Sequence, residues 1–202
     1  LVGFGGGEEV GKDEGFQKLV GGMYVRDVCL ELLNLQPGER VLDLGCGPAM
    51  YLNKMPQIEY FGFDTDRRYI EYARARFGSR GNFFCEAFDE QHALDLRPFN
   101  CVMLMGLLHH LDDTACHQLL TLVASVLAPG GRIITLDTVV HDGQNRFERF
   151  FAISDRGKYV RRPEQFTSLA SASFNHAVGA LIEAWWIPST FWHMVLREPR
   201  VL

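Results

Sequence analysis

The sequence lacks the features that mark proteins stabilised by disulfides, proteins with structural zinc sites and membrane-spanning proteins. It has five cysteines, an odd number, and no Cys-x-x-Cys pair, which argues against a disulfide framework and against a thiolate zinc site. No apolar run approaches the ~18 residues that a bilayer span needs, and the start does not read as a secretory signal. Cysteines in apolar runs behave as small hydrophobic residues, so a reducing cytoplasm is the expected setting.

An excess of positive charge is absent too. The formal net charge is −5 and the isoelectric point is near 5.8, which disfavours a general nucleic-acid or membrane-surface binder. Hydrophobic residues make up 47% and charged residues 22%, so a folded globular chain is expected. The length of 202 residues suits a single domain, 1–202, with the glycine-rich residues 1–13 as a flexible arm.

The chain alternates apolar, β-rich runs with amphipathic helical patterns and has no internal repeat. Five runs are predicted as buried strands: Arg40–Leu44, Glu59–Phe63, Asn82–Phe88, Asn100–Met105 and Arg132–Val140. Helices are predicted at Glu14–Leu35, at Thr65–Phe77, at Asp112–Leu127 and from Pro163 onward. This alternation predicts βαβ units and a parallel sheet covered by helices on both faces.

The tail of the chain has a different pattern. Ser173–Ile187 and Phe191–Glu198 are predicted as two further strands, joined by a short Pro-Ser turn at 188–189. Because so short a turn can join only antiparallel strands, the expected sheet is mixed, with five parallel strands and a hairpin-like pair at one edge.

The turn after the first strand carries the first chemical signal, in the sequence VLDLGCGPAM at 41–50. Glycines at a strand-to-helix turn let the backbone approach a ligand, as in dinucleotide-binding folds. Here Asp43 precedes the turn, and Ala49 and Met50 stand where a third glycine is expected, so the dinucleotide fingerprint is not met. A carboxylate would repel a pyrophosphate and attract a sulfonium or ammonium group, which favours S-adenosylmethionine over NAD.

A second acid follows at the end of the second strand. Asp64 lies 64 − 43 = 21 positions after Asp43, the spacing at which an acid binds ribose hydroxyls. The alternative is a helix cap, since a helix is predicted directly after it. We expect Thr65 or Asp66 to cap that helix and Asp64 to bind ribose.

Five segments together resemble the class I S-adenosylmethionine-dependent methyltransferases, in the order and spacing of that family. They are VLDLGCGP (41–48), YFGFDTD (60–66), FFCEAFD (83–89), FNCVMLMGLLHHLDD (99–113) and LAPGGRIITLD (127–137). The resemblance covers roughly residues 14–140, and the tail by topology alone. It implies a single Rossmann-like, doubly wound mixed sheet of about seven strands, with the last strand antiparallel and helices on both faces.

The resemblance also implies a set of residues that bind S-adenosylmethionine and its product S-adenosylhomocysteine. The implied set is Asp43, Gly45, Cys46, Gly47, Asp64, Thr65, Glu86, Ala87, Met105 and Gly106. Asp43 and the glycines would line the methionine end, Asp64 the ribose, Glu86 the adenine, and Met105 with Gly106 the sulfur side. The sequence departs from the family at Ala49 in place of a glycine and at Glu86 in place of an aspartate, where Asp89 competes for the role.

The histidines His110 and His141 are the candidate catalytic residues. His109 and His110 are adjacent and cannot face one way, so no joint metal site is expected, and a core or capping role outweighs that of a general base. His141 follows the fifth strand and could take a proton from an acceptor, although a surface histidine is the simpler interpretation.

Residues 141–162 are predicted to form a substrate-side insertion or lid, because they lie past the carboxyl end of the fifth strand. In one interpretation, FERFF is an amphipathic helix over the pocket, and the following basic residues bind an acidic or phosphorylated acceptor. In the other, the charges form a solvated face.

The expected function is that of a methyltransferase of the EC 2.1.1 type, which moves a methyl group to an O or N atom of a small-molecule acceptor. The alternatives are a non-catalytic Rossmann-like partner subunit, a methyltransferase acting on RNA or protein, and a dinucleotide oxidoreductase. Nucleic acid is the less favoured acceptor because the chain is acidic overall.

Overall fold

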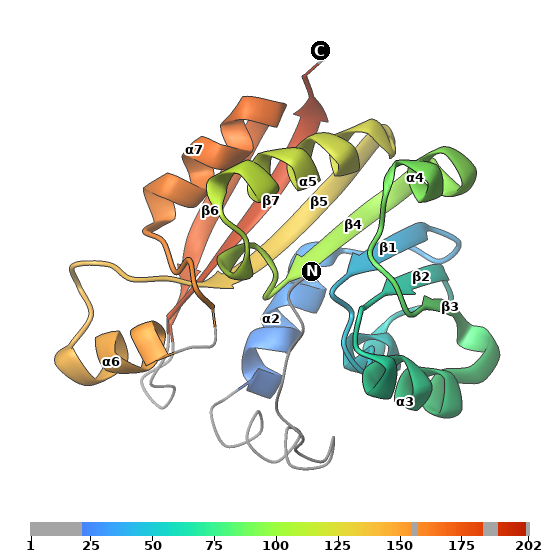
Figure 1. The fold of residues 1–202 in the computed structure, drawn as a ribbon, viewed down its shortest axis with the longest axis horizontal. Helices are drawn as coiled ribbons and strands as arrows, with labels where there is room; N and C mark the ends of the chain where they lie inside the picture. The colour runs from blue at the N-terminus through green and yellow to red at the C-terminus, as the bar shows by residue number, and fades with distance from the viewer. Residues whose placement is uncertain (1–21, 155–156, 184–189, 201–202) are drawn as a thin grey trace.

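The computed structural model describes residues 22–154, 157–183 and 190–200 of the chain. Within them, seven strands form one sheet in the order β3-β2-β1-β4-β5-β7-β6 (Figure 1). The strands are β1 (Arg40–Leu44), β2 (Glu59–Phe63), β3 (Gly81–Phe84), β4 (Phe99–Met105), β5 (Leu127–Thr138), β6 (Phe174–Ile182) and β7 (Phe191–Pro199). The first five run parallel, and β7 runs antiparallel to both β5 and β6. The predicted mixed, Rossmann-like α/β sheet is therefore confirmed.

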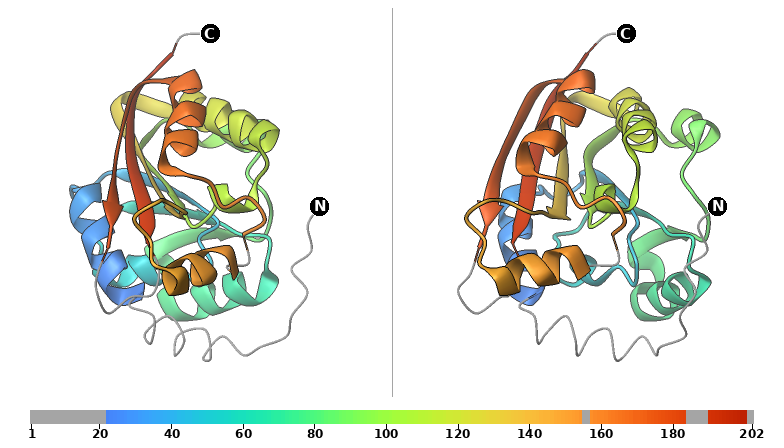
Figure 2. Two further views of the ribbon diagram at one scale, coloured as in Figure 1. Left: turned by 90° about the vertical axis from the view of Figure 1, so that its left-hand side faces the viewer. Right: turned by 60° about the vertical axis from the view of Figure 1, so that its left-hand side comes forward.

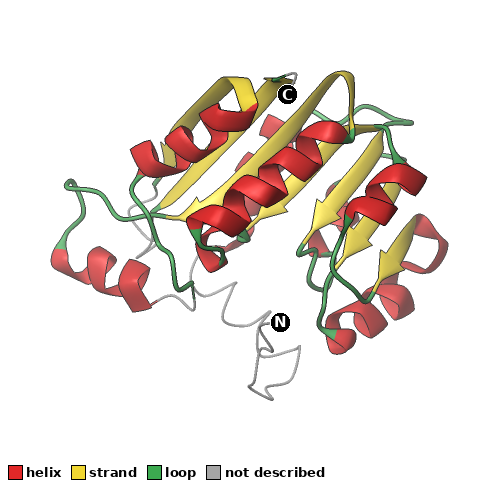
Figure 3. Ribbon diagram, turned by 45° about the horizontal axis from the view of Figure 1, so that its top comes forward, coloured by secondary structure: helices red, strands yellow, loops and turns green. Residues whose placement is uncertain are grey.

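Helices cover both faces of the sheet, and α4, α5 and α7 lie together on one of them (Figure 3). The helices are α2 (Gly22–Leu33), α3 (Arg67–Phe77), α4 (Glu90–Leu96), α5 (Asp113–Ser125), α6 (Arg146–Ser154) and α7 (Pro163–Ser173). Successive strand residues point to opposite faces. Leu42 and Phe61 accordingly pack with α4, α5 and α7, whereas Val41 and Tyr60 pack with α2 and α3.

The helix α6 stands apart from these two layers. It follows β5 and lies beyond the edge at which the parallel strands end (Figures 1 and 2). Its three large outward residues, Phe147, Phe150 and Ile153, are 63%, 65% and 61% exposed. Only Ala152 of this helix is buried, so α6 contributes little to the core.

Several element bounds differ from the predicted ones. The predicted third strand ended at Phe88, but β3 ends at Phe84, because Asp89 caps the short helix α4 by accepting a hydrogen bond from the backbone N–H of His92 at 2.9 Å. The pattern of α4 was missed because it buries one side chain, Ala93. The glycine turn leads into the 3-10 helix η1 (Met50–Lys54).

The Pro129-Gly130-Gly131 stretch, which precedes the predicted fifth strand, lies inside β5. That strand begins at Leu127, pairs with Phe99, and shifts register before Arg132 pairs with Cys101. The glycines therefore permit an irregularity in the ladder, with Gly130 at φ +75°. The predicted arm 1–13, the start of the first helix and the turn at 188–189 lie outside the described residues.

Candidate active site

The candidate site lies where the strand order reverses, between β1 and β4. In an open α/β sheet this switch point is where ligands bind, at the carboxyl ends of the strands. Gly45 follows β1 at φ +71° and Gly106 follows β4 at φ +78°, and both are exposed. The backbone N–H groups of Gly45 and Cys46 both donate to the Phe63 carbonyl, at 2.9 and 3.0 Å, so the turn is tied to the end of β2. The result is an open edge lined by backbone.

Asp64 holds the glycine turn in place. One carboxylate oxygen accepts from the backbone N–H of Gly47 at 2.9 Å, and the other accepts from the N–H of Asp66 at 2.8 Å. Each oxygen retains a further acceptor position, so the carboxylate can still bind hydroxyl groups. Burial raises the pKa of Asp64 from its ordinary value, while these N–H donors act to lower it.

Asp66 caps the helix that follows Asp64, and it is one of the two residues predicted for that role. Its side chain accepts from the backbone N–H of Arg68 at 2.9 Å and opens α3. Thr65 lies between the two acids and is exposed. The two acids therefore have different roles. Asp66 caps α3, and Asp64 accepts a hydrogen bond from the glycine turn.

Asp43 is buried beneath the same turn, with 1% of its surface exposed. Its Oδ2 atom accepts a hydrogen bond from the Tyr60 hydroxyl at 2.6 Å. Burial raises the pKa of Asp43 to about 7, the Tyr60 hydrogen bond acts to lower it, and the charge of Asp64 acts to raise it. The pKa of this carboxyl group thus lies close to neutral pH.

Cys46 and Ala49 complete the turn. Cys46 is buried, and burial is the main cause that raises the pKa of its thiol, so this side chain acts as a packing group. Ala49 is buried at φ 55° and ψ 34°, in the left-handed region that glycine favours. The turn therefore keeps the backbone conformation that a third glycine would adopt, although the residue is alanine.

The residues predicted for adenine lie at the end of β3. Glu86 and Ala87 are both exposed, and Glu86 Oε1 is 3.4 Å from His92 Nε2. Asp89 accepts from His92 at the start of α4, so its carboxylate is engaged in capping. Of the two acids, Glu86 is the one whose carboxylate is not engaged in a helix cap. On β4, Met105 is half-buried beside Gly106.

The two adjacent histidines occupy different environments in the 3-10 helix η3 (Leu108–His110). His109 is buried, with Nδ1 2.8 Å from Asp137 Oδ1, and its backbone N–H donates to the same oxygen at 3.1 Å. Gly157 lies against the His109 ring, since a Cβ atom at Gly157 would be 2.0 Å from His109 Cδ2. His110 is half-buried, and the two rings lie 4.2 Å apart. The predicted core role therefore belongs to His109.

His141 lies past β5, in the loop that precedes α6. Its Nδ1 accepts from the backbone N–H of Gly143 at 3.2 Å, and its Nε2 is 3.2 Å from Glu183 Oε1. With Nδ1 as acceptor, the neutral ring carries its proton on Nε2. This arrangement fixes the ring between the loop and the end of β6.

Two arginines of the segment 141–162 are engaged within the protein. The buried Arg161 donates to the carbonyls of Leu108 and Leu111, at 3.1 and 2.7 Å, and to Asp113 at 2.7 Å. Arg162 pairs with Asp142 at 2.7 Å. The exposed cations of the described segment are Arg146, Arg149 and Lys158.

Sequence reasoning missed three structural partners of the site: Tyr60, Asp137 and Arg161. Tyr60 stands on the same strand face as Gly62, two residues before it, and this tyrosine-x-glycine spacing was the available signal. Asp137 ends the fifth matching segment, LAPGGRIITLD, but nothing in that segment indicates its partner His109. Nothing in the local sequence separates the buried Arg161 from its half-buried neighbour Arg162.

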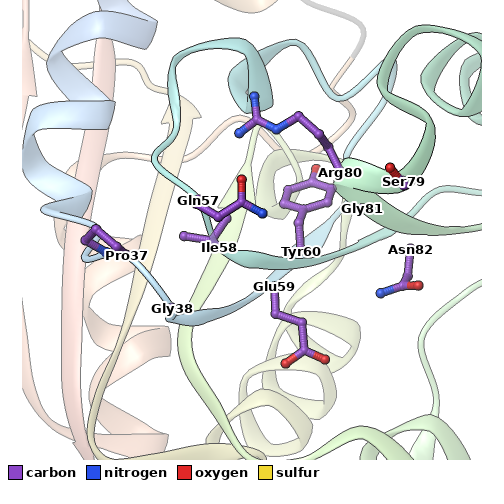
Figure 4. Close-up of a pocket in the computed structure, with 10 residues that line it drawn as sticks. All are labelled: Pro37, Gly38, Gln57, Ile58, Glu59, Tyr60, Ser79, Arg80, Gly81 and Asn82. Carbon is purple, nitrogen blue, oxygen red and sulfur yellow. The ribbon is translucent and has the colours of Figure 1, made fainter.

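A hollow of about 430 Å³ lies elsewhere, at the amino ends of the strands (Figure 4). Glu59 of this hollow pairs with Arg40, and Arg80 donates to the carbonyls of Met55 and Pro56. Its two charged side chains are thus used by the fold, and it lies at the opposite edge of the sheet from the glycine turn. Within the described residues, no group of three or more His, Cys, Asp and Glu side chains could hold a metal, and no helix is long and apolar enough to cross a membrane.

Comparison with known proteins decides the family. Residues 41–131, from β1 into β5, match the family model described as "Methyltransferase domain". The chain contains a class I S-adenosylmethionine-dependent methyltransferase domain. The predicted family is confirmed, and the glycine turn, Asp43 and Asp64 all lie within this methyltransferase domain.

Related proteins share this domain at moderate identity. Methyltransferase GfsG of Streptomyces halstedii is 32% identical over 117 residues, which are 54% of this chain and 41% of that protein. A probable tRNA methyltransferase 9B of Mus musculus is 30% identical over 122 residues, 58% of this chain and 26% of that protein. The match therefore spans less than half of either relative.

Solved structures share the fold. The phosphoethanolamine N-methyltransferase 2 of Haemonchus contortus, in complex with S-adenosyl-L-methionine, superposes with a TM-score of 0.67 at 15% identity. The superposition covers 88% of this chain and 53% of that one. It extends beyond residues 41–131, which the family model matches, so the shared fold is larger than that match.

Proposed function

We propose that this protein transfers a methyl group from S-adenosylmethionine to an O or N atom of a small-molecule acceptor. The observation that carries the proposal is the pair of carboxylates at one glycine turn. Asp64 is tied to Gly47, and the buried Asp43 lies below the same turn. A phosphate-free, cationic nucleoside matches this arrangement, whereas a pyrophosphate at the turn would be repelled by the Asp43 carboxylate.

The residues present fit that cofactor. Gly45 and Gly106 are exposed at neighbouring strand ends, and a Cβ atom at Gly47 would meet nothing within 4 Å, so the backbone edge is open. Asp43, Gly45, Cys46 and Gly47 would hold the methionine end, and Asp64 with Thr65 the ribose. Glu86 and Ala87 would lie by the adenine, and Met105 and Gly106 by the sulfur. When bound, the cofactor supplies an electrophilic methyl group.

The protein's own contribution is to align the acceptor and exclude water, which supplies much of the acceleration in such displacements. A strong base is needed only for an acceptor that is a poor nucleophile at neutral pH. His110, on η3 beside the end of β4, is the candidate proton acceptor. His141 is the weaker candidate, because Gly143 and Glu183 occupy its surroundings.

The segment 141–162 would cover the acceptor. An acceptor with an apolar part fits it, because α6 exposes Phe147, Phe150 and Ile153 on one side. The acidic or phosphorylated acceptor suggested by the sequence has weaker support, because Arg161 and Arg162 are already paired. Arg146 and Arg149 of α6 are exposed and could still bind an anionic group.

Titration calorimetry with S-adenosylhomocysteine and with NAD tests the cofactor. We expect heat with the first and none with the second. Heat with NAD alone would overturn the proposal in favour of an oxidoreductase, and heat with neither would favour a non-catalytic partner subunit.

The acceptor is tested by transfer of labelled methyl from S-adenosylmethionine to three pools: small-molecule extract, total tRNA and protein. Label in the first pool supports the proposal. RNA is the second candidate, because one relative is a probable tRNA methyltransferase. Label in tRNA alone, lost steeply with added salt, would replace the small molecule by RNA.

A further inference from the structure

Among the residues that the structure describes, the Asp43 carboxylate accepts a side-chain hydrogen bond from the hydroxyl of Tyr60. The two groups lie 2.6 Å apart, and each residue has 1% of its surface exposed. A hydrogen bond to an ionised group in a buried setting is strong, and it also fixes the direction in which the second oxygen points.

The sheet makes room for the Tyr60 ring. Tyr60 stands opposite Gly81 on β3, and Gly62 stands opposite Asp43 on β1. A Cβ atom at Gly62 would be 2.9 Å from Tyr60 Cε1, and one at Gly81 would be 2.8 Å from Tyr60 Cδ1. Neither glycine has a positive φ angle, so each is required for space. The ring thus lies across two glycines and spans the two-residue step, roughly 6.7 Å, from its own strand position to the level of Asp43.

We propose that Tyr60 is a positioning residue for cofactor binding, whose hydroxyl holds the Asp43 carboxylate in the orientation and ionised state that a cationic ligand requires. The inference rests on the proposed function, in which Asp43 meets the cationic end of S-adenosylmethionine. Nothing in the ring's packing alone needs a hydroxyl, since phenylalanine would fill the same space over the glycines.

The groups around Asp43 show why the hydrogen bond from Tyr60 matters for the ionisation of this carboxyl group. Asp64, at the end of β2, opposes ionisation of Asp43. Within the described part of the chain, the other titratable groups beside Asp43 are the thiols of Cys46, in the turn, and Cys101, on β4, and burial raises the pKa of both. Tyr60 is therefore the group that favours the charged carboxylate before the cofactor arrives. Its own pKa is raised well above 10 by burial, so it remains a donor at neutral pH.

The test compares wild type with Tyr60→Phe by titration calorimetry of S-adenosylmethionine between pH 6 and pH 8.5, in buffers of different ionisation heat. Without the hydroxyl, the pKa of Asp43 rises above about 7, so the free protein holds its proton more tightly. We expect affinity at pH 7 to fall roughly tenfold, with the deficit shrinking as pH rises. We also expect more protons to be released per cofactor bound at pH 7.

Tyr72→Phe is the matched control, because Tyr72 is a half-buried tyrosine of α3 whose hydroxyl accepts from Arg76 at 3.1 Å. It should leave affinity and proton release unchanged. If wild type binds and Tyr60→Phe has the same pH profile and proton release, the role of Tyr60 is overturned and the proposed function stands. If wild type binds neither S-adenosylmethionine nor S-adenosylhomocysteine, the proposed function itself is overturned.

Gly81→Ala provides a second route if Tyr60→Phe does not fold. The new Cβ would displace the Tyr60 ring without removing any polar group. It should shift the pH profile in the same direction as Tyr60→Phe, and an unshifted profile would overturn the role of Tyr60.

Discussion

The glycine turn and the segment 141–162 lie along the same edge of the sheet, yet they are built differently. At the turn, the acids Asp43 and Asp64 are held by the ends of parallel strands and by backbone N–H groups. In the segment, the buried Arg161 is used to hold the fold together, and the exposed surface is formed by α6. In the proposed function the first region holds the cofactor, whereas the second is a cover that Arg161 and the Tyr159 N–H, which donates to the His109 carbonyl, tie to η3 beyond the end of β4.

The largest effect is expected at Asp64. Asp64→Ala removes both the acceptor for the Gly47 N–H and the proposed ribose contact, so affinity for S-adenosylhomocysteine should fall about a hundredfold in titration calorimetry. Asp66→Asn is the control, because asparagine retains the helix cap. An equal loss of affinity in both variants would contradict the separate roles of Asp64 and Asp66.

Arg161 tests the attachment of the cover. Arg161→Met removes the guanidinium hydrogen bonds to the carbonyls of Leu108 and Leu111, and we expect a loss of about 2 kcal/mol in the free energy of unfolding. A loss of that size lowers the melting temperature by roughly 4–8 °C.

The same variant should leave affinity for S-adenosylhomocysteine nearly unchanged, because Arg161 touches none of the turn. Arg162→Met is the neighbouring control, and its solvent-exposed pair with Asp142 predicts little change in melting temperature. A large loss of cofactor affinity in Arg161→Met would mean that the two regions are coupled.

Asp43 makes the free energy of unfolding of the protein depend on pH. Its folded-state pKa of about 7 lies above the ordinary value of 3.8, so the folded protein binds the proton more tightly than the unfolded chain. The contribution of Asp43 to the free energy of unfolding is fully present below about pH 4 and is lost as the pH rises through about 7. In the absence of cofactor, Asp43→Asn should therefore melt above wild type at pH 8, with the difference shrinking toward pH 5. A difference that grows toward acid pH would contradict the sign.

The smallest effect on stability is expected at α6. The double variant Phe147→Ser and Phe150→Ser removes side chains that are more than 60% exposed, so the melting temperature and the affinity for S-adenosylhomocysteine should hardly change. The Michaelis constant for an apolar acceptor should rise. A large drop in melting temperature would show that these rings are packed within the fold.

Sequence reasoning predicted the cofactor side better than the cover, for a physical reason. The strands β1 and β2 match their predicted bounds because short apolar runs ended by acids and glycines have few alternative conformations. The placement of Asp43, Asp64 and the glycines then follows from strand direction. The helix α4 was missed because it buries one residue, and too little of its pattern repeats.

The roles of Arg161 and His109 could not be predicted, because their partners are distant in the chain. Arg161 contacts a carbonyl 53 positions away, and His109 pairs with an acid 28 positions away. Local sequence specifies which residues can form such bonds, but the tertiary fold selects those that do.

The ring of Tyr60 and the two glycines beneath it also have a consequence for how this domain can diverge. Positions 60, 62 and 81 share one fixed volume, since a methyl group at either glycine would collide with the ring. They should therefore be inherited as a set: descendants that lose the aromatic ring become free to gain side chains at the other two positions, and those that keep it do not. A loss of Tyr60 would thus be hard to reverse once its space had been filled.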